Sequence, residues 1–138
     1  MWVYPNQVIS NQNWAPNTGF DLLQALGEDD GRYIYNTAPT NSVELGMPEE
    51  VVNCELRVQG NGSQATPTLV LNFYRAGTQI DSISIPTTND WETSNLIVDR
   101  WDSVELIAVG NDSVDVDFLR AEPYGGSPTK RTLTGVGI

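Results

Sequence analysis

The chain has 138 residues, and 18 acidic residues against 7 basic ones leave a formal net charge of −11 at pH 7. It has no histidine and a single cysteine, Cys54, which excludes Ser-His-Asp and Cys-His catalysis, an intrachain disulfide, and zinc sites built on imidazole or thiolate clusters. The acidity argues against wrapping of nucleic acid, which needs clustered Lys and Arg, and no apolar run approaches the ~18 residues that span a membrane.

The length predicts one domain that can bury a core without disulfides or metals. Residues 1–10 lack a basic region followed by an apolar run, so we expect no signal peptide and folding in the cytoplasm of the producing cell. The polar residues are largely Asn, Gln, Ser and Thr, with 12 glycines and 8 prolines, a composition that favours β-structure with many turns.

The first predicted element in chain order is a short helix over residues 21–26. Phe20, Leu23 and Leu26 have helical spacing, Thr18 is placed to cap the helix, and Gly27 is placed to end it. Two turns are too short to be stable alone, so we expect this helix to pack on a larger body.

From residue 43 onwards, apolar and polar residues alternate with period two, as in strands that bury one face. Residues 2–9, 33–35 and 95–98 add further strands. Turn signals every eight to twelve residues separate about eight or nine short strands, which predicts an antiparallel sandwich or barrel. The expected inward-facing residues are Val43, Leu45, Val52, Cys54, Leu56, Val58, Leu69, Leu71, Phe73, Ile83, Ile85, Val104, Leu106, Ala108, Val114, Val116 and Phe118.

The last segment, residues 125–138, differs from the rest because it is Gly-rich, has no alternation and has no acid. Residues 1–122 hold all 18 acidic residues and five arginines, a formal charge of −13, whereas the terminal segment adds Lys130 and Arg131. We predict a β-sandwich domain over residues 1–124 and an extended basic arm over residues 125–138 that docks on a neighbouring subunit. A disordered tail is the alternative.

The acidic residues offer no convincing catalytic or metal site. Glu28, Asp29 and Asp30 do not follow the spacing of a calcium loop, and Asp115 and Asp117 share one strand face that we expect to meet solvent. Cys54 alternates with apolar residues and is predicted to be a small buried side chain. We therefore predict no catalytic residue, no metal and no cofactor; a small glycan hydrolase is the weakest alternative.

The order of several segments resembles that of jelly-roll modules in tailed-bacteriophage virions, which include capsid decoration or cement proteins and minor tail or head-fibre proteins. The resemblance covers roughly residues 3–123. It implies an antiparallel jelly-roll β-sandwich of about eight or nine strands with a short N-terminal helix. The matching segments are YPNQV at 4–8, NWAP at 13–16, the helical region at 22–34, ELRV at 55–58, LNFYRAG at 71–77 and VDVDFLRAEP at 114–123.

This resemblance implies a structural protein on the capsid surface, a homotrimer that cements the shell by binding the major capsid protein, with no nucleic-acid or membrane partner. A trimer multiplies weak contacts through effective concentration, and extended arms add strands to a neighbour's exposed edge. The predicted partner-binding residues are Trp2, Val3, Tyr4, Lys130, Arg131, Leu133, Val136 and Ile138.

The alternative function is a carbohydrate- or receptor-binding β-sandwich module of a phage tail or head fibre. In that interpretation Trp14, Trp91 or Trp101 is exposed and stacks on a sugar ring, whereas large aromatic residues more often anchor a core or a loop. One fold serves both uses, so the fold alone does not decide between them.

Overall fold

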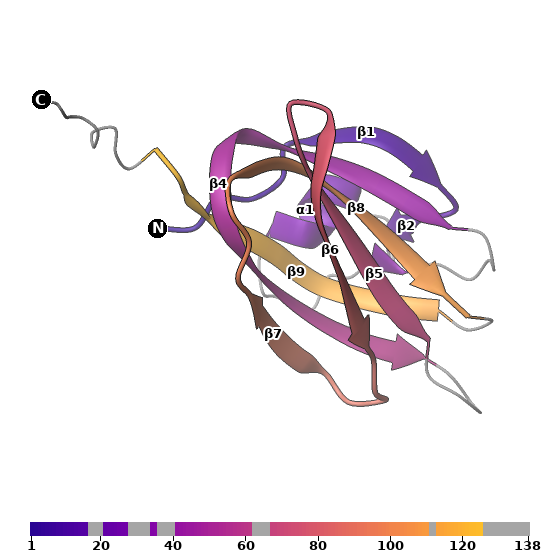
Figure 1. Cartoon of the computed structure of the whole chain (residues 1–138). Helices are drawn as coiled ribbons and strands as arrows, with labels where there is room; N and C mark the ends of the chain where they lie inside the picture. Colours follow the sequence, from indigo (N-terminus) through magenta and orange to yellow (C-terminus); the bar gives the residue numbers. More distant parts are fainter. Residues whose placement is uncertain (17–20, 28–33, 36–40, 62–66, 111–112, 126–138) are drawn as a thin grey trace, which may run out of the picture.

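The computed structural model describes residues 1–16, 21–27, 34–35, 41–61, 67–110 and 113–125 (Figure 1). In these residues the chain forms nine β-strands and one short helix, which confirms the predicted antiparallel jelly-roll β-sandwich. The elements are β1 (Gln7–Gln12), β2 (Ala15–Pro16), α1 (Leu22–Gly27), β3 (Ile34–Tyr35), β4 (Ser42–Asn61), β5 (Thr68–Arg75), β6 (Thr78–Pro86), β7 (Glu92–Leu96), β8 (Trp101–Val109) and β9 (Ser113–Pro123).

The 20-residue strand β4 belongs to both layers of the sandwich. Its first part pairs with β1 and β8, and its second part pairs with β7 and β9. One layer therefore has the order β1–β4–β8–β5–β6, and the other has the order β7–β4–β9–β3–β2. Pairing with β8 breaks between Gly46 and Val51, where Pro48 has no N–H for the ladder. The strands predicted on either side of Pro48 are thus one bent strand (Figure 1).

Asn53 interrupts the alternation of β4. Its φ of 57° is left-handed, a conformation that Asn adopts more readily than most residues, and the pairing with β9 shifts between Val52 and Glu55. The inward face changes phase there, so that Val51 and Cys54 are buried while Val52 is only half-buried. The prediction that Val52 faces the core was wrong, because strict alternation assumes a strand without a bulge.

Strand β9 also changes phase, at Asp117. This residue is extra in β9, because its neighbours Val116 and Phe118 pair with adjacent residues of β4. The core contains Val116 before the bulge and Leu119 after it. Phe118 was predicted to face the core beside Val116. It is buried, with 3% of its surface exposed, but it lies outside the main core cluster and contacts Arg120 instead.

Asp115 and Asp117 are buried, with only 8% and 1% of their surface exposed, so the predicted solvent-facing pair was wrong. Asp117 Oδ2 lies 2.7 Å from Arg57 Nη1, and the Arg57 guanidinium in turn lies 4.9 Å from the centroid of the Trp91 ring. A buried carboxylate is tolerated when a cation compensates it, and this pair meets that condition for Asp117.

The helix α1 packs against β9 and is capped by Asp21. The Asp21 carboxylate accepts a hydrogen bond of 2.9 Å from the backbone N–H three residues later, so the helix starts one residue after the predicted position. Leu22 and Leu26 are buried, while Leu23, predicted to face inward, is half-buried. The predicted cap, Thr18, lies outside the described residues.

The β5–β6 hairpin turns at Ala76 and Gly77, one of the turn signals in the sequence. Ala76 and Gly77 both have positive φ, 50° and 80°, as a two-residue type I′ turn requires.

A strand was predicted over residues 95–98, but β7 ends before Val98. The backbone of Val98 instead bonds Asn53: its N–H donates to Asn53 Oδ1 at 3.2 Å, and its C=O accepts from the Asn53 N–H at 2.8 Å.

The bulge predicts an unusual order of stability among variants of Asn53. Asn53→Ala should lower the free energy of unfolding by about 2–3 kcal/mol, because it removes side-chain hydrogen bonds and strains a left-handed residue. Asn53→Gly should cost only about 1–2 kcal/mol, because glycine accepts this backbone conformation. Urea unfolding of both variants measures the difference. An alanine variant at least as stable as the glycine variant would contradict this account.

Candidate functional site

The N-terminal residues lie along β9 of their own chain. The Val3 N–H donates to the Ala121 carbonyl at 2.8 Å and the Ala121 N–H donates back at 2.9 Å, so Val3 is buried. This pairing brings the neighbouring Trp2 and Tyr4 onto Arg120. Of the three N-terminal residues predicted to bind a partner, Val3 packs in its own core, whereas Trp2 keeps 39% of its surface exposed.

Arg120 contacts two aromatic rings and one carboxylate. Its guanidinium carbon lies 4.1 Å from the Trp2 ring centroid and 4.4 Å from that of Phe118. Its Nε donates to Glu55 Oε1 at 2.7 Å, and Nη2 lies 2.5 Å from the same oxygen. Burial alone would lower the pKa of Arg120, but the hydrogen bonds with Tyr4 and Glu55 raise it overall. Arg120 therefore stays charged and fixed.

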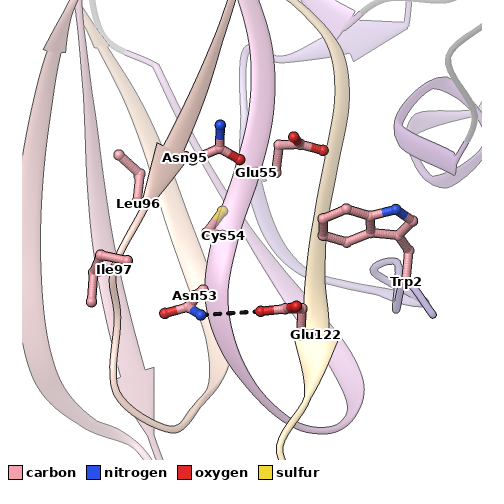
Figure 2. A pocket seen from close by; sticks show the side chains of 8 residues that line it. All are labelled: Trp2, Asn53, Cys54, Glu55, Asn95, Leu96, Ile97 and Glu122. Atoms are coloured by element: carbon pink, nitrogen blue, oxygen red, sulfur yellow. Dashed lines mark hydrogen bonds between the residues drawn. The ribbon is translucent and has the colours of Figure 1, made fainter.

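A pocket of about 160 Å³ lies beside this cluster (Figure 2). Figure 2 shows Trp2 on the β9 side of the pocket and the β7 residues on the other side. Asn53 Nδ2 donates to Glu122 Oε1 at 3.1 Å, which joins the bulge of β4 to the end of β9. An indole, two amides and two carboxylates thus share one small hollow. The lining residues are Trp2, Asn53, Cys54, Glu55, Asn95, Leu96, Ile97 and Glu122.

The register explains why these residues meet. Asn95 of β7 pairs with Glu55 of β4, and Glu55 pairs with Arg120 of β9, so the three side chains form one row across neighbouring strands. The next row along contains Arg57 and Phe118. In both rows a guanidinium lies against an aromatic ring, Arg120 against Trp2 and Arg57 against Trp91. We call these residues, with Trp2, Trp91 and Asp117, the arginine–aromatic face.

The tryptophans occupy different positions from those expected of stacking platforms. Trp14 and Trp101 are buried, 3% and 0% exposed, so both are core anchors and neither is the exposed platform that the sugar-binding alternative required of it. Trp101 packs edge-on against Phe73 at 5.0 Å between ring centroids and donates its indole N–H to the Asn53 carbonyl at 2.9 Å. Trp91 is half-buried on Arg57. Trp2 takes the exposed position beside a pocket, and only its docking on β9 places it there.

Cys54 is a buried thiol, as predicted. It is 2% exposed, and burial, with a smaller contribution from Glu55, raises its pKa well above the usual range. A thiol held in its neutral form under the sheet is a poor nucleophile, so the sulfur contributes packing to this region rather than chemistry.

The other residues singled out in the sequence lie outside the described part of the chain. These are the acidic run Glu28–Asp30 and the terminal residues Lys130, Arg131, Leu133, Val136 and Ile138, so their predicted roles remain predictions. Among the described residues there is no group of three or more His, Cys, Asp or Glu side chains arranged to hold a metal ion. The described part of the chain also contains no helix with the length and apolarity needed to cross a membrane.

The opposite layer carries a second polar cluster on its outer surface. Glu44 and Glu105 pair across β4 and β8, and Ser103 Oγ donates to Glu44 Oε2 at 2.9 Å. Asn72 Nδ2 and the Tyr74 hydroxyl each lie 3.2 Å from Glu105 Oε1. These partners are neutral. Burial, and then the charge of Glu105, raises the pKa of Tyr74 above its usual value.

No protein-family model and no curated relative matches this sequence. A fucose binding module from Streptococcus pneumoniae has a similar fold, with a TM-score of 0.57 and 7% identity over 81% of this chain and 95% of that one. A family 29 carbohydrate-binding module complexed with cellulohexaose gives a TM-score of 0.58 and 13% identity, over 88% and 89% of the two chains. A cleaved adhesin domain of Lys-gingipain gives 0.60 and 9%, over 87% and 88%.

The Glu55–Arg120 pair predicts a measurable coupling. Arg120→Ala should lower the free energy of unfolding by about 2–3 kcal/mol, because it leaves the largely buried Glu55 carboxylate without a cation. The double variant Glu55→Ala/Arg120→Ala should cost about 1–2 kcal/mol less than the sum of the single variants. Arg75→Ala, which breaks a pair with the 80%-exposed Asp99, serves as the surface control. Additive effects of the two substitutions would contradict the pair's proposed strength.

Tyr74 predicts a loss of stability at high pH. Because its pKa is higher in the folded than in the unfolded chain, its contribution is intact below about pH 10 and is lost as the pH rises through the folded pKa. Tyr74→Phe should therefore flatten part of the fall in unfolding free energy above about pH 10. Urea unfolding across this range measures it, with Glu105→Gln as an intermediate case. A steeper fall in the phenylalanine variant would contradict the assignment.

Proposed function

We propose that this chain is a carbohydrate-binding module and that its sugar site is the pocket beside Trp2. The observation that carries the proposal is the combination of a partly exposed indole with carboxylate and amide groups in one hollow, on the arginine–aromatic face. In this proposal the chain binds a sugar and does not catalyse a reaction. The jelly-roll fold supports it, because the similar structures include a fucose binding module and a carbohydrate-binding module in complex with cellulohexaose.

A sugar ring needs two kinds of contact, and the pocket offers both. The C–H groups of one ring face form an apolar surface that stacks on an aromatic ring, and Trp2 presents such a ring. The hydroxyl groups around the ring edge need paired donors and acceptors. Glu122 offers acceptor oxygens, and the amides of Asn53 and Asn95 offer both functions.

The rigidity of the platform also favours binding. The Trp2 indole rests on the Arg120 guanidinium, which Glu55 fixes from the edge, so little rotamer freedom remains to be lost when a ligand binds. The pocket is smaller than the clefts of about 300–1,000 Å³ that enclose drug-sized ligands. We therefore infer that it receives one sugar residue, with the remainder of a glycan lying across the sheet or in solvent.

The sequence resemblance to phage virion modules remains a prediction about where such a module is carried. A sugar-binding jelly roll on a tail or head fibre is compatible with both the sequence resemblance and the candidate pocket. Trimer formation and attachment to a major capsid protein are further predictions of the same resemblance.

The test is a glycan array followed by titration calorimetry with the strongest ligand. The unaltered chain should bind at least one neutral glycan, and Trp2→Ala should weaken this binding about 10-fold or more, because the stacking surface is lost. Trp2→Phe should retain part of the affinity. Tyr124→Ala, which removes an aromatic ring of similar exposure that does not line the pocket, should stay within about twofold. Absence of any glycan binding, or equal affinity for Trp2→Ala, would refute the proposal.

A further inference from the structure

Each arginine around the candidate pocket already has a carboxylate nearby. Arg120 bonds Glu55 and lies against the rings of Trp2 and Phe118. Arg57 bonds Asp117 at 2.7 Å. Arg100 lies 5.0 Å from the Tyr124 ring centroid and 3.9 Å from a carboxylate oxygen of Glu50. Each of these guanidinium groups thus has a carboxylate within ion-pair distance, and none of the three lines the pocket.

The two carboxylates of the pocket have different partners. Glu55 has a cation within 2.5 Å, and 16% of its side chain is exposed. Glu122, in contrast, is exposed and receives a neutral amide donor from Asn53 at 3.1 Å. None of the eight lining residues is Lys or Arg. The charge that meets an incoming ligand is therefore the carboxylate of Glu122, on a chain whose net charge is −11.

We infer that the pocket selects amino sugars: it binds a sugar residue with a free, charged amino group more tightly than a neutral one and rejects uronate or sulfated residues. Glu122 is the specificity-determining residue, because its carboxylate accepts a charge-assisted hydrogen bond from the ammonium group. An anionic residue would instead meet the exposed carboxylate of Glu122 in a pocket whose eight lining residues include no Lys or Arg. This inference rests on the proposed sugar-binding function and specifies the ligand class of that site.

The carboxylate of Glu122 is well placed for this role. Glu122 and Trp2 both line the pocket, so one residue can stack and the other can bind a substituent at the ring edge (Figure 2). Asn53 restrains the carboxylate from the β4 side and leaves its second oxygen for a ligand. Ile97, 83% exposed, provides an apolar border that offers no competing hydrogen bond.

The experiment compares four trisaccharides by titration calorimetry at pH 6 and physiological salt: a glucosamine trimer, an N-acetylglucosamine trimer, cellotriose and trigalacturonate. The unaltered chain should bind the glucosamine trimer about 10-fold more tightly than the two neutral trimers, and trigalacturonate should show no binding. Physiological salt screens the long-range attraction of an acidic chain for any cation, so that contacts within the pocket dominate.

Glu122→Gln is the decisive variant, since an exposed side chain is replaced by its neutral isostere and the fold should be unaffected. It should bind the glucosamine trimer no more tightly than the neutral trimers, whose affinities should change by less than about threefold. Asp90→Asn removes the same charge from an exposed residue outside the pocket and should keep the full preference.

The outcomes separate the two proposals. The amino-sugar inference is overturned if trigalacturonate binds as tightly as the neutral trimers. It is also overturned if Glu122→Gln keeps the glucosamine preference unchanged. Either result leaves the sugar-binding function standing. Loss of the preference in Asp90→Asn as well as in Glu122→Gln also overturns the amino-sugar inference, because general charge would then explain the effect. If none of the four trisaccharides and no arrayed glycan binds, the proposed function fails and the inference fails with it.

Discussion

The left-handed conformation of Asn53 is the constraint on which this half of the molecule depends. The bulge changes which residues of β4 enter the core, and it releases the Asn53 side chain and backbone to bond outside the ladder. Those bonds hold Val98, the Trp101 indole and Glu122. One residue thereby connects the loop after β7, the start of β8 and the end of β9, and the same residue lines the candidate pocket.

A second fixed element is Arg120, which turns the first residues of the chain into a wall of the pocket. The backbone pairing of Val3 with Ala121 sets the position of the N-terminal segment, and the guanidinium then supports the indole of Trp2. Ion pairs near a surface contribute little stability by themselves. Here the pair with Glu55 has a more specific consequence, because it fixes the cation against the Trp2 ring, outside the lining of the pocket.

The Asn53 bulge and the fixed Arg120 together shape the surface around the pocket. The arginine–aromatic face combines charge with stacking, but its cations are used internally, and the carboxylate of Glu122 is left for a ligand. A jelly roll supports many functions, so the fold supplies only a rigid sheet on which such a face can be built. The proposed sugar specificity therefore depends on which charges are already paired rather than on the number of charges present.

The sequence by itself determined the all-β class, the alternating core of β5 and β8, the β5–β6 turn and the burial of Cys54, because these depend on local periodicity and turn chemistry. It did not predict the phase changes at Asn53 and Asp117, since a bulge is selected by pairing with a distant strand. Only the tertiary structure decided that Trp2 is exposed beside Glu122 while Trp14 and Trp101 are buried. The pocket unites residues from both ends and the middle of the chain, and no local pattern records such long-range contacts.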